Sequence, residues 1–235
     1  MRIAFFHIGK DISRANIFCK SARRAFGNNI EIIQISDLET PKAKEVEKVF
    51  RSKQFKKNKI MYWRMVGYRD LLKLEPEPTV FFDTDMLVMQ KFQINFEKGP
   101  FLCRRSYDRE KVLQDHAYLN QSVKILFKEH KDKKLGELYP FVGCFYADKN
   151  CLFLSEAIKA YDSLDEHYQF WFGDQIALRE AAKVLPFSTL PESIVACSHS
   201  KYIPRQKNAI AVHFKGAGNK SLMEKIFFEM SAGSP

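Results

Sequence analysis

The chain has 235 residues, of which 46% are hydrophobic and 14% aromatic, and this is enough to bury one substantial core. Its 38 Lys and Arg exceed its 28 Asp and Glu, a net charge of +10, but no nucleic-acid-binding motif accompanies the excess, so nucleic acid is not an expected partner. Five cysteines without a CxxC pair argue against a zinc or disulfide framework, and no apolar run is long enough to span a membrane. We therefore expect a cytoplasmic protein.

The first half of the chain alternates strand-like and helix-like segments. Residues 2–8 (RIAFFHI) and 29–35 (NIEIIQI) have the composition of buried strands, and residues 13–26 between them have the apolar spacing of a helix. A long helical stretch is then expected from Pro41 to about Leu74, before PEPT turns the chain into the strand TVFF. This alternation predicts a single α/β domain over residues 1–230, with a mostly parallel sheet flanked by helices and a flexible tail over 231–235.

Two aspartates interrupt the next apolar run. In FFDTDMLV, Asp83 ends one strand-like segment and Asp85 precedes another. Ionised carboxylates are costly to bury unless a positive group lies beside them, so we expect a cation or a basic side chain at this point. Ligands of open α/β sheets bind beyond the carboxyl ends of the strands, and two hard oxygen ligands there suit Mg²⁺ or Mn²⁺. The alternative is a structural turn in which the aspartates cap neighbouring amides.

The basic excess is concentrated before this motif. Eight Lys or Arg occur between Lys42 and Lys59, with aromatic residues among them. One interpretation is a solvated helix face that only covers the sheet. The other is a basic helix that docks on an anionic bilayer, which would place the protein peripherally at the inner membrane face.

Four segments in order along the chain resemble the GT-A-fold glycosyltransferases, and in particular glycosyltransferase family 8. The first is the Asp-x-Asp of FFDTDMLV. The others are PFVGCFYADK (140–149), WFGDQIAL (171–178) and AVHFKGAGNK (211–220). The chain departs from the family pattern in the last segment, where the lysine comes one position late and no Pro-Trp follows. The resemblance implies a GT-A-like, Rossmann-like single domain.

The resemblance also assigns roles to individual residues. A divalent Mn²⁺ or Mg²⁺ would be held by Asp83, Asp85 and His213. Asp174 and Gln175 would be the catalytic residues. The residues expected to contact the nucleotide-sugar donor are His7, Arg64, Thr84, Gly143, Lys215, Gly216 and Lys220.

The implied activity is transfer of a sugar, as a hexosyltransferase, from a nucleotide-sugar, in the first place a UDP-sugar, to a glycan or lipid-linked acceptor, with a retaining outcome. Bound metal would stabilise the charge that develops on the leaving diphosphate. Functional loops determine specificity in such scaffolds, so residues 103–138 are expected to cover the acceptor. The candidates to contact it are Arg104, Arg105, Tyr107 and His116.

Two other functions stay open on the sequence. A phosphatase or phosphotransferase would use Asp83 as nucleophile and Asp85 as acid/base, although Leu87 replaces the threonine of that motif. A non-catalytic basic binding module is the second. Single residues also have simpler interpretations: His213 as a buried, hydrogen-bonded histidine, Arg64 as a surface arginine, and Asp174 as a carboxylate favoured at the first turn of a helix.

Overall fold

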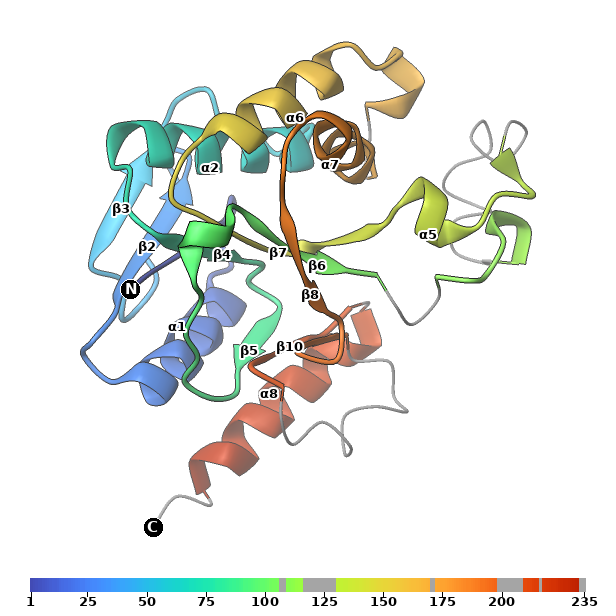
Figure 1. The fold of residues 1–235 in the computed structure, drawn as a ribbon. Coiled ribbons are helices and arrows are strands. Elements are labelled where there is room, and N and C mark those ends of the chain that lie inside the picture. Colours follow the sequence, from blue (N-terminus) through green and yellow to red (C-terminus); the bar gives the residue numbers. More distant parts are fainter. Residues whose placement is uncertain (106–108, 116–129, 170–171, 198–208, 216, 233–235) are drawn as a thin grey trace.

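The computed structural model describes residues 1–105, 109–115, 130–169, 172–197, 209–215 and 217–232 as a mixed α/β protein (Figure 1). The strands are β1 (Arg2–Phe6), β2 (Glu31–Ser36), β3 (Lys48–Arg51), β4 (Thr79–Phe82), β5 (Met86–Val88), β6 (Phe101–Arg104), β7 (Phe141–Asp148), β8 (Ser188–Pro191), β9 (Val195–Cys197) and β10 (Ala211–His213). The helices are α1 (Ser13–Phe26), α2 (Ile60–Leu74), α5 (Leu135–Leu138), α6 (Leu152–Asp162), α7 (Gly173–Val184) and α8 (Ala217–Ala232). Short 3₁₀ turns are η1 (Phe96–Lys98), η2 (Leu113–Asp115) and η3 (Glu166–Tyr168).

A seven-stranded sheet in the order β3-β2-β1-β4-β7-β6-β8 forms the centre of the protein. β7 runs antiparallel to β4 and β6, and the other pairings in this sheet are parallel. A second, three-stranded sheet has the order β5-β10-β9. The expected mostly parallel sheet flanked by helices is thereby confirmed.

Helices cover both faces of the large sheet, and successive side chains of a strand alternate between them. Ile3 and Phe5 of β1 pack in one apolar cluster with residues of α1 and α8. Ala4 and Phe6 pack in the other, with residues of α2, α6 and α7. Figure 1 shows these two groups of helices on opposite sides of the sheet. Burial on both faces explains why the strands are continuous apolar runs instead of alternating apolar and polar residues.

The segment between β2 and α2 differs from the helix expected from Pro41 onward. Residues 48–51 form β3, which pairs in parallel with β2, and the helix begins only at Ile60. Phe55 is buried against Phe6 and Trp63, so it fixes the connection to the core. Val49 and Phe50 are β-branched or aromatic residues that favour an edge strand, and here sheet pairing overrides the helix-like charge pattern. The basic helix proposed to dock on an anionic bilayer is therefore not formed by residues 42–59.

Other boundaries agree with the sequence or shift slightly. The helix expected over 13–26 is α1, and Gly27 follows it with a φ of 63°, a left-handed value that suits glycine. α8 continues to Ala232, two residues into the segment expected to be a tail. Among the described helices, none combines the length and apolar character that crossing a membrane requires.

Candidate functional site

The Asp-x-Asp motif lies where the large sheet meets the small one. β4 ends at Phe82, and the backbone N–H of Asp83 donates to the carbonyl of Cys144 on β7 at 3.2 Å. β5 of the small sheet begins directly after Asp85. The two carboxylates are therefore at the carboxyl end of a central parallel strand, which is the edge at which open α/β sheets bind ligands.

The small sheet brings His213 to the same place. His213 ends β10 and pairs with Met86 of β5, and the N–H of Phe214 donates to the carbonyl of Asp85 at 2.8 Å. One ligand atom each from Asp83, Asp85 and His213 lies within 4.8 Å of the others. Within this set, His213 Nε2 is 3.2 Å from Asp85 Oδ1. The two ends of the chain segment from 83 to 213 are thus joined in one cluster.

The cluster fits a hard divalent cation. Two carboxylate oxygens and an imidazole nitrogen are ligands that Mn²⁺ and Mg²⁺ accept, and the partial exposure of both aspartates leaves room for water or phosphate oxygens. Two ligand atoms that each lie about 2.1 Å from one metal ion are at most about 4.2 Å apart. Small side-chain rotations would therefore bring the three ligand atoms, now within 4.8 Å of one another, to metal-binding distances. His213 Nδ1 is buried, and the ring is oriented by packing, by the Asp85 contact at Nε2 and by the neighbouring Cys144 thiol.

Asp85 lies beside His213 and Lys220, and both side chains affect its pKa. Burial acts to raise the pKa of Asp85, but His213 and Lys220 lower it to about 2. Burial acts to lower the pKa of His213, and the neighbouring Cys144 and Asp85 outweigh it, so that this pKa lies well above its usual value. Lys220 Nζ is 3.8 Å from Asp85 Oδ2. The positive groups that the sequence required beside the aspartates are therefore present.

Arg64 of α2 links Asp83 to Asp174, the second residue of α7. Its Nη1 donates to Asp83 Oδ1 at 2.5 Å, and its Nη2 donates to Asp174 Oδ2. Asp174 Oδ1 also accepts from the N–H of Gln175 at 2.9 Å. Burial acts to lower the pKa of Arg64, but the two carboxylates outweigh it and raise this pKa. Arg64 is thus a buried bridging residue, and its interpretation as a surface arginine is wrong.

Gly143 of β7 lies directly against this bridge. A Cβ at position 143 would lie 2.9 Å from Arg64 Nη2 and 3.0 Å from Asp174 Oδ2, so these two side chains would have to shift to accommodate it. The absence of a side chain therefore lets Arg64 and Asp174 meet over the strand. The resemblance assigned Gly143 to the donor, and the structure adds that it makes room for the residues that position Asp83.

The remaining predicted residues lie around this centre. Thr84 is a partly exposed residue between the two aspartates, and Lys215 follows β10 by two positions. His7 follows β1 at the same edge of the sheet, and its Nε2 is 2.9 Å from the carbonyl of Asp11. Gln175 is buried, and its Oε1 accepts from Arg105 Nη2 at 3.0 Å. Gly216 lies outside the described residues.

Sequence reasoning missed Cys144, whose buried thiol lies beside the His213 imidazole. The signal was available, because alternation along β7 puts residue 144 on the face opposite Gly143. Of the acceptor candidates, Arg104 is exposed and Arg105 is buried, whereas Tyr107 and His116 lie outside the described residues.

Comparison with known proteins supports the fold. No protein-family model and no curated protein sequence matches the chain. Among solved structures, it is similar to the glycosyltransferase GlyE of Streptococcus pneumoniae TIGR4, with a TM-score of 0.61 and 12% sequence identity. The chain therefore has the same type of fold as this glycosyltransferase. The similarity covers 100% of this chain and 64% of GlyE, so the chain spans about two thirds of the length of that protein.

Proposed function

We propose that the protein is a metal-dependent glycosyltransferase of the GT-A type, related to family 8, that moves a sugar from a UDP-sugar to a glycan or lipid-linked acceptor. The observation that carries this proposal is the cluster of Asp83, Asp85 and His213 at the carboxyl end of β4. A glycosyltransferase fold with that cluster in that place supports nucleotide-sugar chemistry over the phosphatase and the non-catalytic module.

Three groups of residues would have separate roles in binding the donor: metal binding, positioning of Asp83 and contact with the phosphates. Asp83, Asp85 and His213 would hold Mn²⁺ or Mg²⁺, which supplies positive charge to the diphosphate when bound. Arg64 keeps Asp83 in place by donating to it and to Asp174. Lys220, beside Asp85, is close enough to add a second positive charge for the phosphates, and Lys215 would extend this basic rim.

Gln175 is the residue that we assign to the sugar. Its amide is oriented by Arg105 and it follows Asp174 at the start of α7, so its position is fixed from both sides. A retaining enzyme needs a weak nucleophile or stabiliser near the anomeric carbon, and Gln175 would supply it. The catalytic role expected for Asp174 stays a prediction as well: both of its oxygens accept hydrogen bonds from within the protein, as Gln175 Oε1 does from Arg105.

The deciding experiment is calorimetric titration of UDP into the protein with and without MnCl₂. We expect metal-dependent binding that falls at least about a hundredfold in Asp83→Asn or Asp85→Asn, because each change removes an anionic oxygen from the cluster. Asp162→Asn, an exposed aspartate at the end of α6, is the matched control and should bind as the parent does. UDP binding that is absent, or indifferent to metal, would overturn the proposal.

Donor specificity and stereochemistry need a second measurement. Hydrolysis of UDP-, GDP- and CMP-sugars with Mn²⁺ present identifies the donor, because water replaces the missing acceptor. Proton NMR of the first sugar released shows whether the anomeric configuration is kept. An inverted product would leave the glycosyltransferase proposal standing and remove the role of Gln175.

A further inference from the structure

A second site is suggested by a cavity lined by α5, α7 and the strands β6, β7 and β8. The cavity has a volume of about 530 Å³ and lies at the β6–β8 edge of the large sheet. Pockets for small ligands usually enclose about 300 to 1,000 Å³, so a sugar ring with a charged substituent fits this volume. Its lining residues are Arg104, Arg105, Arg109, Gly136, Pro140, Phe141, Arg179, Ala182, Lys183, Phe187 and Thr189.

The lining is strongly basic. Four arginines and one lysine face the cavity, and no Asp or Glu is among the described residues that line it. Two acidic residues outside the lining offset part of this charge: Glu180 pairs with Arg179 and Lys183, and Glu110 lies 3.7 Å from Arg109. Five cationic side chains thus converge on one cavity, and this arrangement favours an anionic ligand group.

Arg105 connects the cavity to the proposed active site. It is 6% exposed, its Nε donates to the carbonyl of Tyr139 at 2.7 Å, and its Nη2 donates to Gln175 at 3.0 Å. Gln175 follows Asp174, which is held by Arg64 together with Asp83. A ligand in the cavity therefore lies against the same buried arginine that orients Gln175. This position suits the acceptor, since the donor phosphates belong at the metal cluster.

Apolar side chains form the rest of the wall. Phe141 and Phe187 pack edge to face with their ring centroids 5.4 Å apart, and Pro140 and Ala182 complete this side. A site with an apolar wall and several guanidinium groups binds a molecule that has both a hydrocarbon or sugar face and a phosphoryl group. Arginine suits phosphoryl oxygens because its planar fork donates two parallel hydrogen bonds.

We propose that this cavity binds the phosphoryl group of a phosphorylated acceptor. The acceptor role rests on the proposed glycosyltransferase function, whereas phosphoryl binding itself does not. Two sources share this chemistry: a soluble sugar phosphate and the diphosphate of a lipid-linked acceptor.

The test is calorimetric titration of a hexose 1-phosphate, and separately of a short isoprenyl diphosphate, into the full chain in EDTA. EDTA keeps either probe from binding through a metal at the Asp83 cluster. We expect binding of at least one probe, no binding of the unphosphorylated hexose, and loss of about tenfold or more in affinity in Arg104→Gln/Lys183→Gln. The probe that binds more tightly identifies the source of the phosphoryl group.

A matched control separates local charge from net charge. Lys159 pairs with Glu156 three residues earlier on α6, as Lys183 pairs with Glu180 on α7, and Lys159 does not line the cavity. Lys159→Gln should therefore bind the probe as the parent does. Equal affinity of the parent and the double variant, or no binding of either probe, overturns the cavity proposal.

The same proteins are titrated with UDP and Mn²⁺. Phosphoryl binding with no metal-dependent UDP binding would keep the site and reject the proposed function. Metal-dependent UDP binding with no phosphoryl binding would reject the cavity site and keep the proposed function. In the double variant, UDP affinity with Mn²⁺ should stay unchanged, because neither substituted residue lies in the metal cluster.

Discussion

Two buried arginines lie at opposite ends of the central strands, and their surroundings differ in one respect. Arg2 is at the amino end of β1, where it pairs in register with Thr79 at the start of β4. Arg64 lies at the other end of β4, beside Asp83. Both are surrounded by carboxylates, so burial of an arginine does not distinguish a structural network from a functional one.

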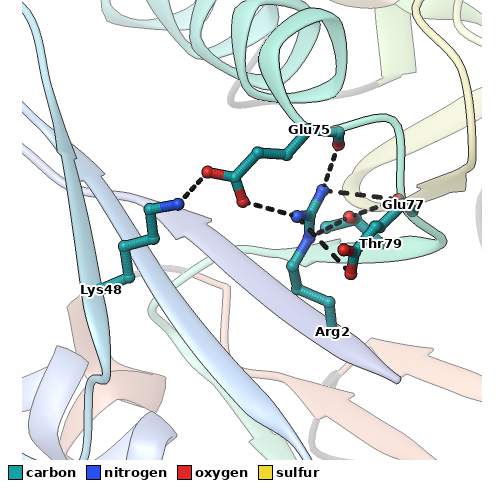
Figure 2. A network of polar contacts seen from close by, with 5 residues as sticks. All are labelled: Arg2, Lys48, Glu75, Glu77 and Thr79. Atoms are coloured by element: carbon teal, nitrogen blue, oxygen red, sulfur yellow. Dashed lines mark hydrogen bonds and ion pairs between the residues drawn. The ribbon is translucent and has the colours of Figure 1, made fainter.

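The amino-end network uses its polar atoms internally (Figure 2). Arg2 donates to Thr79 Oγ1 at 2.7 Å, to Glu75 Oε2 at 2.9 Å and to the Glu75 carbonyl at 2.6 Å. The other oxygen of Glu75 accepts from Lys48, and the carbonyl of Glu77 lies 3.5 Å from Arg2. This cluster joins β1, β3 and β4 and needs no further ligand.

The carboxyl-end cluster has carboxylates in excess. Asp83, Asp85 and Asp174 face two permanent cations, Arg64 and Lys220. His213 balances the third carboxylate when it is protonated, but it binds a metal only as the neutral imidazole, and in that form the carboxylates are in excess. An excess of partly exposed acceptor atoms, more than burial of an arginine, therefore distinguishes the end of the strands that fits a cation.

The largest effect should come from breaking the carboxyl-end bridge. Arg64→Ala leaves Asp83 and Asp174 without their shared cation, and removal of one partner from a buried ion pair costs about 3–5 kcal/mol. Urea unfolding should show this loss in the free energy of unfolding. Arg64→Lys keeps the charge but lacks a fork that reaches both carboxylates, so it should lose less. A loss below about 1 kcal/mol in the alanine variant would contradict the assigned bridge.

Breaking the amino-end network should lower the free energy of unfolding slightly less and leave UDP binding unchanged. Arg2→Ala should lower the free energy of unfolding by about 3 kcal/mol, the low end for a buried pair, because the side chain of Glu75 is 30% exposed. Glu77→Gln is the control, since that side chain is 70% exposed and should cost less than about 1 kcal/mol. Calorimetry on folded Arg2→Ala should give the parental affinity for UDP with Mn²⁺. A weakened affinity would place this network in the binding machinery.

Metal should stabilise one cluster only. Mn²⁺ at about one hundred times its Kd should raise the free energy of unfolding by about 2.7 kcal/mol, because the ion binds the folded state, and EDTA should reverse the gain. The gain should persist in Arg2→Lys and vanish in Asp85→Asn. Thermal unfolding with and without MnCl₂ measures it. Equal stabilisation of both variants would mean that Mn²⁺ binds elsewhere.

Gly143→Ala should lower the free energy of unfolding by about 1–3 kcal/mol, the usual cost of an overpacked site. The reason is that the new Cβ crowds Arg64 and Asp174 in the carboxyl-end cluster. UDP affinity should fall with it as Asp83 loses its position. Ala147→Val on the same strand is the control, since residue 147 lies between Val80 and Phe101 in the sheet. Urea unfolding and calorimetry together should show a stability loss in both variants and a binding loss only in the first.

The smallest effects should come from the two peripheral lysines. Lys48 is 47% exposed and Lys220 is 35% exposed, so replacing either by Met should change the free energy of unfolding by about 0.5 kcal/mol or less. Only Lys220→Met should weaken UDP binding in the presence of Mn²⁺. Equal UDP affinity in the two variants would remove Lys220 from the donor site.

Local pattern in the sequence predicted much of the fold. The buried strands and the helix of residues 13–26 follow from apolar runs, helical spacing and Gly27, which act over a few residues. The helix expected from Pro41 to Leu74 was wrong over residues 41–59, since pairing with β2 decided the outcome there. Pairing of strands is a contact between distant segments, and periodicity within one segment does not contain it.

The sequence alone implies that Asp83 and Asp85 need positive partners, because the cost of burying a carboxylate does not depend on the fold. The identity of these partners depends on the folded arrangement of the chain. Arg64 and Asp174 are 110 residues apart, and Gly143 between them has a role only because β7 passes beneath their contact. The five basic residues of the cavity are likewise brought together by strands and helices separated in the chain, so their shared field exists only once the sheet has formed.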